Sequence, residues 1–282
     1  MTVISSRSKT VTFGQGLPTV IVGERINPTG RKSFGEALLA GDLSLVQREA
    51  IEQVQLGADI LDVNVGIAGI DEVEMLPKAV KAVMEVVDVP LCIDSSNPDA
   101  LAAALKVYEG KPLVNSVTGE EASIARILPV IKAHGAAVVG LCMDDNGIPA
   151  DVEGRVAIAK KIAAAAKEAG IPREDLVFDM LTMSVGTDPQ AAMVTLAAVR
   201  QVAREGYSTI LGASNVSFGL PDRRCINLAF LTLAVQAGLS AAIADPKVKD
   251  LSRIIRAVDL LTGLDEWGMR YLEHYRALEK ES

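Results

Sequence analysis

Short apolar runs alternate with longer amphipathic segments along almost the whole chain. Segments such as SLVQREAIEQVQLG and PQAAMVTLAAVRQVAREG place apolar residues at the spacing of one helix face. Strand-length runs that alternate with helices through short links predict a (β/α)8 TIM barrel, an α/β fold, rather than an open sheet. The predicted strands cover residues 19–23, 58–64, 90–94, 113–117, 136–142, 176–179, 209–214 and 239–245.

Several helix boundaries carry the residues that such boundaries favour. Asn97-Pro98, Asp188-Pro189 and Asp245-Pro246 each predict an N-cap followed by proline at the first helical position. Residues 1–16 predict an arm or small hairpin, and residues 265–280 predict an extra C-terminal helix that covers one end of the barrel or a partner subunit. Because no change of composition suggests a second domain, residues 1–282 are expected to form one domain.

Most of the predicted strands end in a polar residue. Active sites of TIM barrels lie at the C-terminal ends of the strands. Side chains two positions apart in a strand point the same way, so Asp62 and Asn64 share one side of theirs. By the same alternation, Ala213 and Asn215 are expected to share one side of their strand. The residues expected to face the barrel axis at one mouth are Asp62, Asn64, Asp94, Asn115, Asp179 and Asn215.

Helix capping is the alternative role for these polar residues. We expect it for Asp245, because Pro246 follows directly. It is a weaker explanation for Asp94, because Asn97 already provides a cap, and for Asp179, which lies well before the next predicted cap. Taken singly, each residue leaves both interpretations open, whereas several in register on successive strands favour a binding site.

The composition supports one large core and a cytoplasmic location. Of the 282 residues, 49% are hydrophobic and 4% aromatic, so Ala, Val, Leu and Ile must build the core. The net charge of −8 and a pI of about 5.0 argue against binding to nucleic acid or to an anionic membrane. No apolar run approaches the ~20 residues of a membrane span, and the polar N-terminus is unlike a signal peptide.

The sequence gives little support to metal or nucleotide chemistry. Cys92, Cys142 and Cys225 lie far apart and form no CxxC pair. His134 stands at a predicted helix end and His274 in the C-terminal segment, where capping or surface roles are expected. We therefore expect no metal site and no histidine base, and the chain has no glycine-rich phosphate loop.

The predicted mouth suits a flat heterocycle with an aminopyrimidinone edge. The ring N–H and exocyclic amino group of such a ligand are donors that need carboxylate or carbonyl acceptors. An aspartate accepts two such N–H groups at once, and a charge-assisted hydrogen bond contributes roughly 1.5–3 kcal/mol. A pterin fits this pattern. A sugar would usually stack on aromatic rings, but the single Trp267 lies in the C-terminal segment.

A set of segments in consecutive order carries a more specific pattern. They are GERIN (23–27), LDVNVG (61–66), CIDSSN (92–97), VNSVTGE (114–120), GLCMDDNGIP (140–149), DLVFD (175–179), GASNVSFGLPDR (212–223) and AAIAD (241–245). The chain resembles the methyltetrahydrofolate:corrinoid protein methyltransferases and the folate domain of cobalamin-dependent methionine synthase. Both belong to the pterin-binding barrels, which also include dihydropteroate synthase.

This resemblance implies roles for individual residues. Asp94, Asn115 and Asp179 would bind the pterin edge, and Asn215 would be the catalytic residue near N5, the atom that carries the methyl group. Further folate-site positions implied by the matching motifs are Gly212, Ser214, Arg223, Glu24, Asp62 and Asn64. The chain departs from the family pattern at Met180, where proline is expected, and at Phe218, where some members carry a polar residue.

The resemblance also implies a reaction and partners. It implies methyl transfer between N5 of tetrahydrofolate or 5-methyltetrahydrofolate and the cobalt of a cobalamin-type corrinoid, with no metal bound by this chain. The corrinoid belongs to a separate corrinoid protein that docks over the mouth, and the barrel is commonly a homodimer. A barrel without fused corrinoid domains suits the tetrahydrofolate-methylating component of an anaerobic demethylation system. The direction of transfer stays open.

Two alternatives remain at this point. Dihydropteroate synthase would need a Ser-Thr-Arg-Pro loop and a lysine on a late strand, where this chain has Asn64-Val-Gly66 and Ser214-Asn215. A non-catalytic pterin-binding barrel would keep the binding residues without the reaction.

Overall fold

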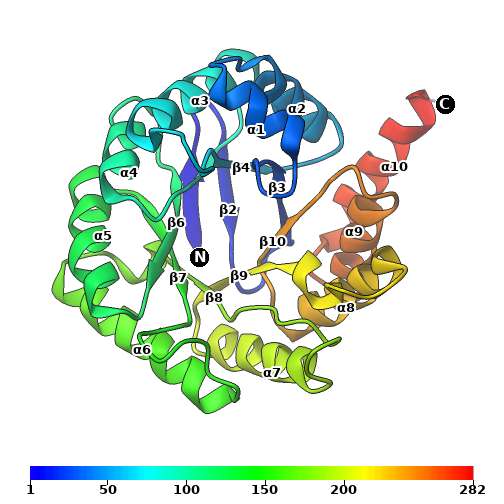
Figure 1. Ribbon diagram of the computed structural model, residues 1–282. Coiled ribbons are helices and arrows are strands. Elements are labelled where there is room, and N and C mark those ends of the chain that lie inside the picture. Colours follow the sequence, from blue (N-terminus) through cyan, green and yellow to red (C-terminus); the bar gives the residue numbers. More distant parts are fainter. Residues whose placement is uncertain (282) are drawn as a thin grey trace.

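Eight parallel strands close into a barrel with helices around the outside, as the alternation predicts (Figure 1). The computed structural model describes the backbone of residues 1–281 and the side chains of residues 1–276. Hydrogen-bonded neighbours follow the order β10-β3-β4-β5-β6-β7-β8-β9. The barrel strands are β3 (Val20–Ile26), β4 (Ile60–Asn64), β5 (Leu91–Asp94), β6 (Leu113–Thr118), β7 (Ala137–Leu141), β8 (Leu176–Asp179), β9 (Ser208–Gly212) and β10 (Ala241–Ala244).

Helices follow the strands and cover the outer face of the barrel. They are α1 (Lys32–Leu39), α2 (Ser44–Gln55), α3 (Glu72–Val86), α4 (Pro98–Leu105), α5 (Glu121–His134), α6 (Val152–Glu168), α7 (Ala191–Arg204), α8 (Arg223–Ala237) and α9 (Leu251–Leu261). Asn97 caps α4 as predicted, since its side chain accepts from Asp99 N and Pro98 is the first helical residue. Gly135 ends α5 at φ +62, a conformation that glycine adopts without steric cost.

The two other predicted Asp-Pro caps are wrong. Helix α7 begins at Ala191, and Asp188 instead accepts a hydrogen bond from Gln190 N in the preceding turn. Helix α9 begins at Leu251, while Asp245 accepts from Lys247 N. In both places the Asp side chain accepts from the backbone N–H two residues on, which forms an Asx turn several residues before the helix begins.

A small hairpin closes the N-terminal end of the barrel. Strands β1 (Thr2–Ser5) and β2 (Thr10–Phe13) form a two-stranded antiparallel sheet. Its side chains Ile4, Val11 and Phe13 pack with the apolar residues inside the barrel. The hairpin backbone bonds to Lys111, the residue two before β6, on both its N–H and its carbonyl. The opposite, C-terminal end of the strands therefore remains as the mouth.

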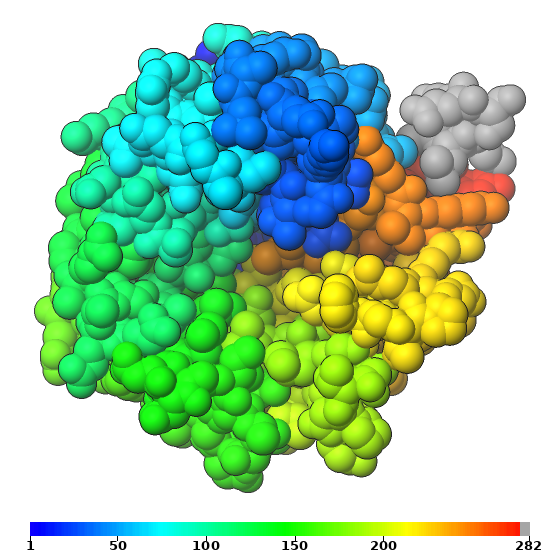
Figure 2. All heavy atoms as spheres, viewed as in Figure 1, coloured from blue at the N-terminus to red at the C-terminus, as the bar shows by residue number. Residues whose placement is uncertain are grey.

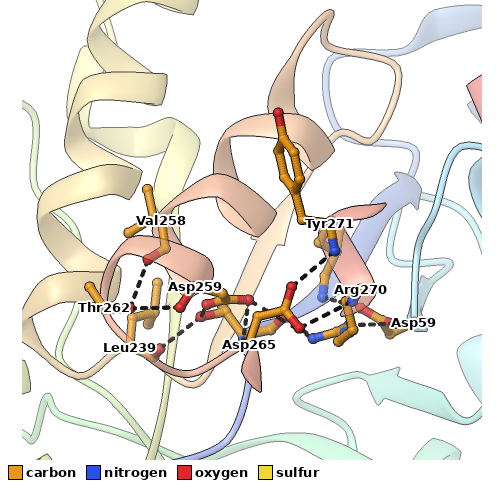
Figure 3. Close-up of polar contacts among 10 residues, drawn as sticks. Asp59, Leu239, Val258, Asp259, Thr262, Asp265, Arg270 and Tyr271 are labelled. Atoms are coloured by element: carbon orange, nitrogen blue, oxygen red, sulfur yellow. Dashed lines mark hydrogen bonds and ion pairs between the residues drawn. The ribbon is translucent and has the colours of Figure 1, made fainter. Parts of the chain in front are cut away.

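The C-terminal segment is anchored at the closed end of the barrel. A 3-10 turn, η3 (Glu266–Gly268), leads into α10 (Met269–Glu281), the predicted extra helix, which packs beside α9. The Arg270 guanidinium pairs with Asp59 at 3.4 Å, and the Asp265 carboxylate accepts from the backbone N–H of Arg270 and of Tyr271 (Figure 3). Asp259 accepts from the backbone and hydroxyl of Thr19, just before β3. The helix thus stabilises the strand starts rather than covering the mouth.

Candidate functional site

On β4, β5, β6 and β8 the inward-facing row of side chains changes from apolar to polar at the mouth. Ile60, Cys92, Leu113 and Val177 pack inside the barrel. The next residues of the same rows, two or four positions on, are Asp62, Asn64, Asp94, Asn115 and Asp179. The predicted direction of these side chains is therefore confirmed, and they are gathered at one end because the parallel strands end there.

Four of these residues form two pairs on β4, β5 and β6, Asn64 with Asp94 and Asp62 with Asn115. Asn64 and Asp94 are register partners, and Asn64 Nδ2 donates to Asp94 Oδ2 at 2.8 Å. Asn64 Oδ1 accepts from Gly66 N at 2.8 Å, which fixes the orientation of its carboxamide. Asp62, only 3% exposed, accepts from the side chains of Cys92 and Asn115. The Asn115 carboxamide carries both a donor and an acceptor at this position.

Asp179 is held from two sides by backbone donors. Its Oδ1 accepts from Leu181 N at 2.7 Å, and its carboxylate also accepts from the backbone N–H of Gly212 at the end of β9. The side chain is 8% exposed, so little of it reaches solvent. These donors restrict the carboxylate to one orientation, which is the arrangement that a preorganised binding group requires.

Burial shifts the acidity of the mouth carboxylates towards neutrality. Desolvation raises the pKa of Asp179 to about 7 and that of Asp94 to about 6, with the Asn64 hydrogen bond opposing the rise at Asp94. Desolvation, and then the charge of Asp94, raises the pKa of Asp62 well above its usual range. Asp62 Oδ1 has no hydrogen-bond partner among the described residues. Such buried carboxylates are stabilised by a donor-rich ligand edge.

The predicted strand 209–214 is shorter than expected, and this changes the position of Asn215. β9 ends at Gly212, and residues Ala213–Ser217 form a 3-10 turn, η2. The expected pairing of Ala213 and Asn215 on one side of a strand is therefore wrong, since Ala213 is buried and Asn215 is exposed. The Asn215 amide nonetheless lies at the site, because Nδ2 would be 3.3 Å from a Cβ atom on Gly212.

Glu24 and Ser214 meet across the β3 and β9 sides of the mouth. The Ser214 hydroxyl lies 3.4 Å from each carboxylate oxygen of Glu24. Burial, and then the negative charge of Asp245, raises the pKa of Glu24, whereas Ser214 and two arginines lower it. Glu24 is thus an acid with a raised pKa next to the residue that precedes Asn215.

Arg223 supports the site from outside it. Its guanidinium donates to Ser217 Oγ at 3.0 Å and to Ser214 O at 2.8 Å, and the side chain is otherwise exposed. Arg223 therefore fixes the η2 turn that carries Ser214 and Asn215. Phe218, the residue after η2, is 68% exposed.

Sequence reasoning missed some residues that contribute to the site. Asp245 was assigned to a helix cap, but it pairs with Arg25 at 3.5 Å beside Glu24. The signal was present, because Ala241 faces the barrel interior and Asp245 continues the same alternation. Nothing in the sequence marked Arg155 or Leu181 as a neighbour of Asp179. In the sequence, an arginine of α6 that becomes buried looks like any surface residue of a helix.

A cavity of about 310 Å³ opens between the ends of β5 and β6 and helix α5. Asp94 and Asn115 line it, together with Ser95, Ser116 and Arg126. Asp179 and Asn215 are not among its lining residues, so the cavity is one part of the mouth. Figure 2 shows the wider mouth as a hollow, with the segment after β3 in blue and the segment after β9 in yellow on its border.

Within residues 1–276, no group of three or more His, Cys, Asp or Glu side chains is arranged to hold a metal ion. Over the same part of the chain, no helix is long and apolar enough to cross a membrane.

Fold and site together define a TIM-barrel protein with an acidic, carboxamide-lined mouth suited to a pterin-type ring. The chain belongs to the family described as pterin binding enzymes, whose model matches residues 23–245. It is 32% identical over 265 residues to the methylcorrinoid:tetrahydrofolate methyltransferase of Eubacterium limosum, covering 91% of this chain and 96% of that protein. It is 30% identical over 266 residues to the methionine synthase of Mycobacterium tuberculosis, covering 89% of this chain but 22% of that protein.

Solved structures of similar fold include dihydropteroate synthases. The enzyme of Xanthomonas albilineans in complex with 7,8-dihydropteroate matches with a TM-score of 0.70 at 20% identity, covering 93% of this chain and 98% of that one. The enzyme of Coxiella burnetii with pteroic acid matches with a TM-score of 0.72 at 16% identity, covering 94% and 100%. At such identities the likeness concerns the fold. The predicted fold class and the predicted family are thus both confirmed.

Proposed function

We propose that this protein is a methyltransferase that moves a methyl group between N5 of tetrahydrofolate and the cobalt of a corrinoid protein. The observation that carries the proposal is the match over nearly the full length of both chains to a methylcorrinoid:tetrahydrofolate methyltransferase. The mouth geometry supports it, because the carboxylates and carboxamides match the donor and acceptor pattern of a pterin edge.

Three side chains would bind the pterin. The ionised carboxylates of Asp94 and Asp179 accept from ring N–H and amino groups, and the Asn115 carbonyl accepts a further N–H. Asn64 and the backbone N–H groups of Leu181 and Gly212 hold these carboxylates in place before the ligand arrives. Asp62 lies next to Asn115, whose side chain opposes the burial-driven rise in the pKa of Asp62.

Asn215 would act at N5. Transfer from methyltetrahydrofolate breaks the N5–CH3 bond, and the electron pair of Co(I) forms the new Co–CH3 bond. N5 keeps the electron pair of the broken bond and takes up a proton. A carboxamide does not supply that proton near neutrality. It can orient a hydrogen bond to N5 that strengthens as the proton arrives, which stabilises the transition state. Glu24, with its raised pKa and its contact with Ser214 in η2, is an acid that can relay a proton from solvent.

The corrinoid would belong to a partner protein that docks over the mouth. The corrinoid supplies Co(I) as the methyl acceptor or methyl-Co(III) as the methyl donor. The apolar side chains of Phe218 and Met183, 68% and 37% exposed, lie on the neighbouring loops after β9 and β8. Ser184 Oγ donates to Phe218 O at 2.6 Å and Val185 N to Val216 O at 3.0 Å, so the two loops form one continuous surface.

The test is an anaerobic visible-spectrum assay with free cobalamin in place of the partner. Methylcob(III)alamin with tetrahydrofolate, and Co(I) cobalamin with methyltetrahydrofolate, are each incubated with the wild-type protein and with Asn215→Ala. We expect wild type to interconvert the pairs and the variant to be slower by about 10²–10³. Absence of reaction together with tight folate binding in calorimetry would favour a non-catalytic pterin barrel, and absence of binding would refute the proposal.

A further inference from the structure

Arg155 is a buried cation whose hydrogen-bond partners are neutral. It projects from α6, is 2% exposed, and donates from Nη1 to the carbonyls of Met180 and Leu181, both at 2.7 Å. Nη1 also lies 3.0 Å from Thr195 Oγ1, and Nε donates to Pro149 O at 3.0 Å. Burying a guanidinium is costly, so an arginine bound to loop carbonyls rather than to a carboxylate points to a role in shaping those loops.

The loop that Arg155 holds contains a residue in an unfavourable conformation. Leu181 has φ +61, a left-handed conformation that costs a branched residue of order 1–3 kcal/mol. Its carbonyl accepts from both Arg155 Nη1 and Thr195 Oγ1, and Thr195 is fully buried. These two donors fix the peptide plane that follows Leu181.

The same Leu181 conformation serves Asp179. Leu181 N donates to Asp179 Oδ1 at 2.7 Å, two residues back along the chain. Met180 follows Asp179 at the position where the family pattern has proline. The backbone here is therefore held by contacts from α6 and α7 and not by a proline ring.

We propose that Arg155 is a positioning residue that holds Leu181 in its left-handed conformation, so that the Leu181 N–H orients the Asp179 carboxylate towards the ligand. This inference rests on the proposed function, because it takes the ligand to be the donor edge of a folate. Arg155 itself does not touch the substrate in this scheme.

Charges around the pair add an electrostatic component. Arg155 faces Asp179 and the thiol of Cys142, the residue after β7. It also interacts with Asp151 at the start of α6 and Asp188 in the loop before α7. Burial raises the pKa of Asp179 to about 7, and the positive charge of Arg155 opposes that rise. Removing the charge is therefore expected to raise the pKa of Asp179 further.

The test compares Arg155→Met, Leu181→Gly and the double variant. We expect Arg155→Met to weaken tetrahydrofolate binding at pH 8 by about tenfold or more in calorimetry. Leu181→Gly supplies the second arm, because glycine adopts φ +61 without steric cost and keeps the N–H that donates to Asp179. In the double variant, binding at pH 8 should recover to within about threefold of wild type, while the Asp179 pKa, followed by carboxyl NMR, stays above the wild-type value.

Thr195→Val provides a second variant if Arg155→Met does not fold. It removes the hydroxyl that donates, together with Arg155, to the Leu181 carbonyl. Tetrahydrofolate binding should weaken by about two- to fivefold. The inference is overturned if folded Arg155→Met binds folate as tightly as wild type, or if Leu181→Gly fails to restore binding in the double variant. Failure of wild type to bind any folate would instead refute the proposed function. Separately, an Asp179 pKa that is unchanged in Arg155→Met would overturn the electrostatic component of the inference.

Discussion

The amide nitrogen of Asn215 lies 3.3 Å from the position that a Cβ atom on Gly212 would occupy. Gly212 also donates its N–H to Asp179, so one small residue at the end of β9 contacts both the candidate catalytic amide and a candidate pterin carboxylate. The absence of a side chain at this position lets the η2 turn bring Asn215 back over the strand end.

Gly212→Ala tests that relationship. The backbone at φ −73, ψ 83 accepts alanine, so the added methyl acts through its contact with Asn215 rather than through backbone strain. We expect the methyl-transfer rate to fall by about tenfold or more, with folate affinity changed by less than about threefold. The rate comes from the cobalamin assay and the affinity from calorimetry. Gly186→Ala, which crowds Ser184 Oγ at the same 3.3 Å, is the matched control and should keep the wild-type rate.

Folate affinity should depend on pH through Asp94 and Asp179. Their pKa values are raised to about 6 and about 7 by burial, and the ligand donors need the ionised forms. Affinity is therefore full above pH 7 and falls as the pH drops through 7 and then 6, since each protonated carboxyl must first release its proton. Each group contributes about a tenfold loss per pH unit below its pKa. Calorimetry between pH 5.5 and about 8.5 gives the profile.

Asn64→Ala identifies which step belongs to Asp94. The Asn64 amide lowers the pKa of Asp94, so its removal should move the lower step to higher pH and leave the upper step in place. A profile that shifts as a whole, or does not shift, would contradict the assignment of Asp94 to the lower step.

Phe218 should matter for the corrinoid partner and not for folate. We expect Phe218→Ala to lower the second-order rate constant with the corrinoid protein by about tenfold, because an exposed aromatic ring beside the reacting centre loses its contact area. Folate affinity should stay at the wild-type value. Leu233→Ala removes a 52% exposed side chain from the outer helix α8 and serves as the control. An equal loss in both variants would rule out a specific docking surface at the mouth.

Asp259 should contribute to stability and not to activity. It is 1% exposed and accepts from both Thr19 N and Thr19 Oγ1, at 3.0 and 2.8 Å, at the closed end of the barrel. Asp259→Ala leaves the Thr19 N–H unpaired and leaves Thr19 Oγ1 only its longer 3.4 Å contact with Leu239 O, so the free energy of unfolding should fall by about 2–4 kcal/mol. Denaturant unfolding measures the loss. Unchanged folate affinity in the folded variant shows that the effect is confined to that end, whereas reduced affinity would contradict this separation.

Several predictions from the sequence agree with the comparisons, and others remain predictions. The pterin-binding family and the TIM barrel are confirmed, and the proposed methyl transfer agrees with the named relative. Homodimer formation, the cytoplasmic location, the single-domain organisation and the roles of individual site residues stay predictions.

The sequence by itself determined the order of strands and helices and the inward direction of the mouth residues on β4, β5, β6 and β8. Both depend on local periodicity: a period of two sends Asp62 and Asn64, and likewise Cys92 and Asp94, to the same face of a strand, and parallel strands bring those faces to one end.

Only the tertiary structure decided how those groups are held. Whether residues 213–217 continue β9 or turn away depends on contacts with β3, Arg223 and the loop after β8, which are distant in the chain. The left-handed conformation of Leu181 depends on a guanidinium from α6 and a hydroxyl from α7, and the role of Asp245 depends on Arg25 across the barrel seam. Local propensity cannot encode such contacts, because each arises only when the closed barrel places separate strand ends and helices beside one another.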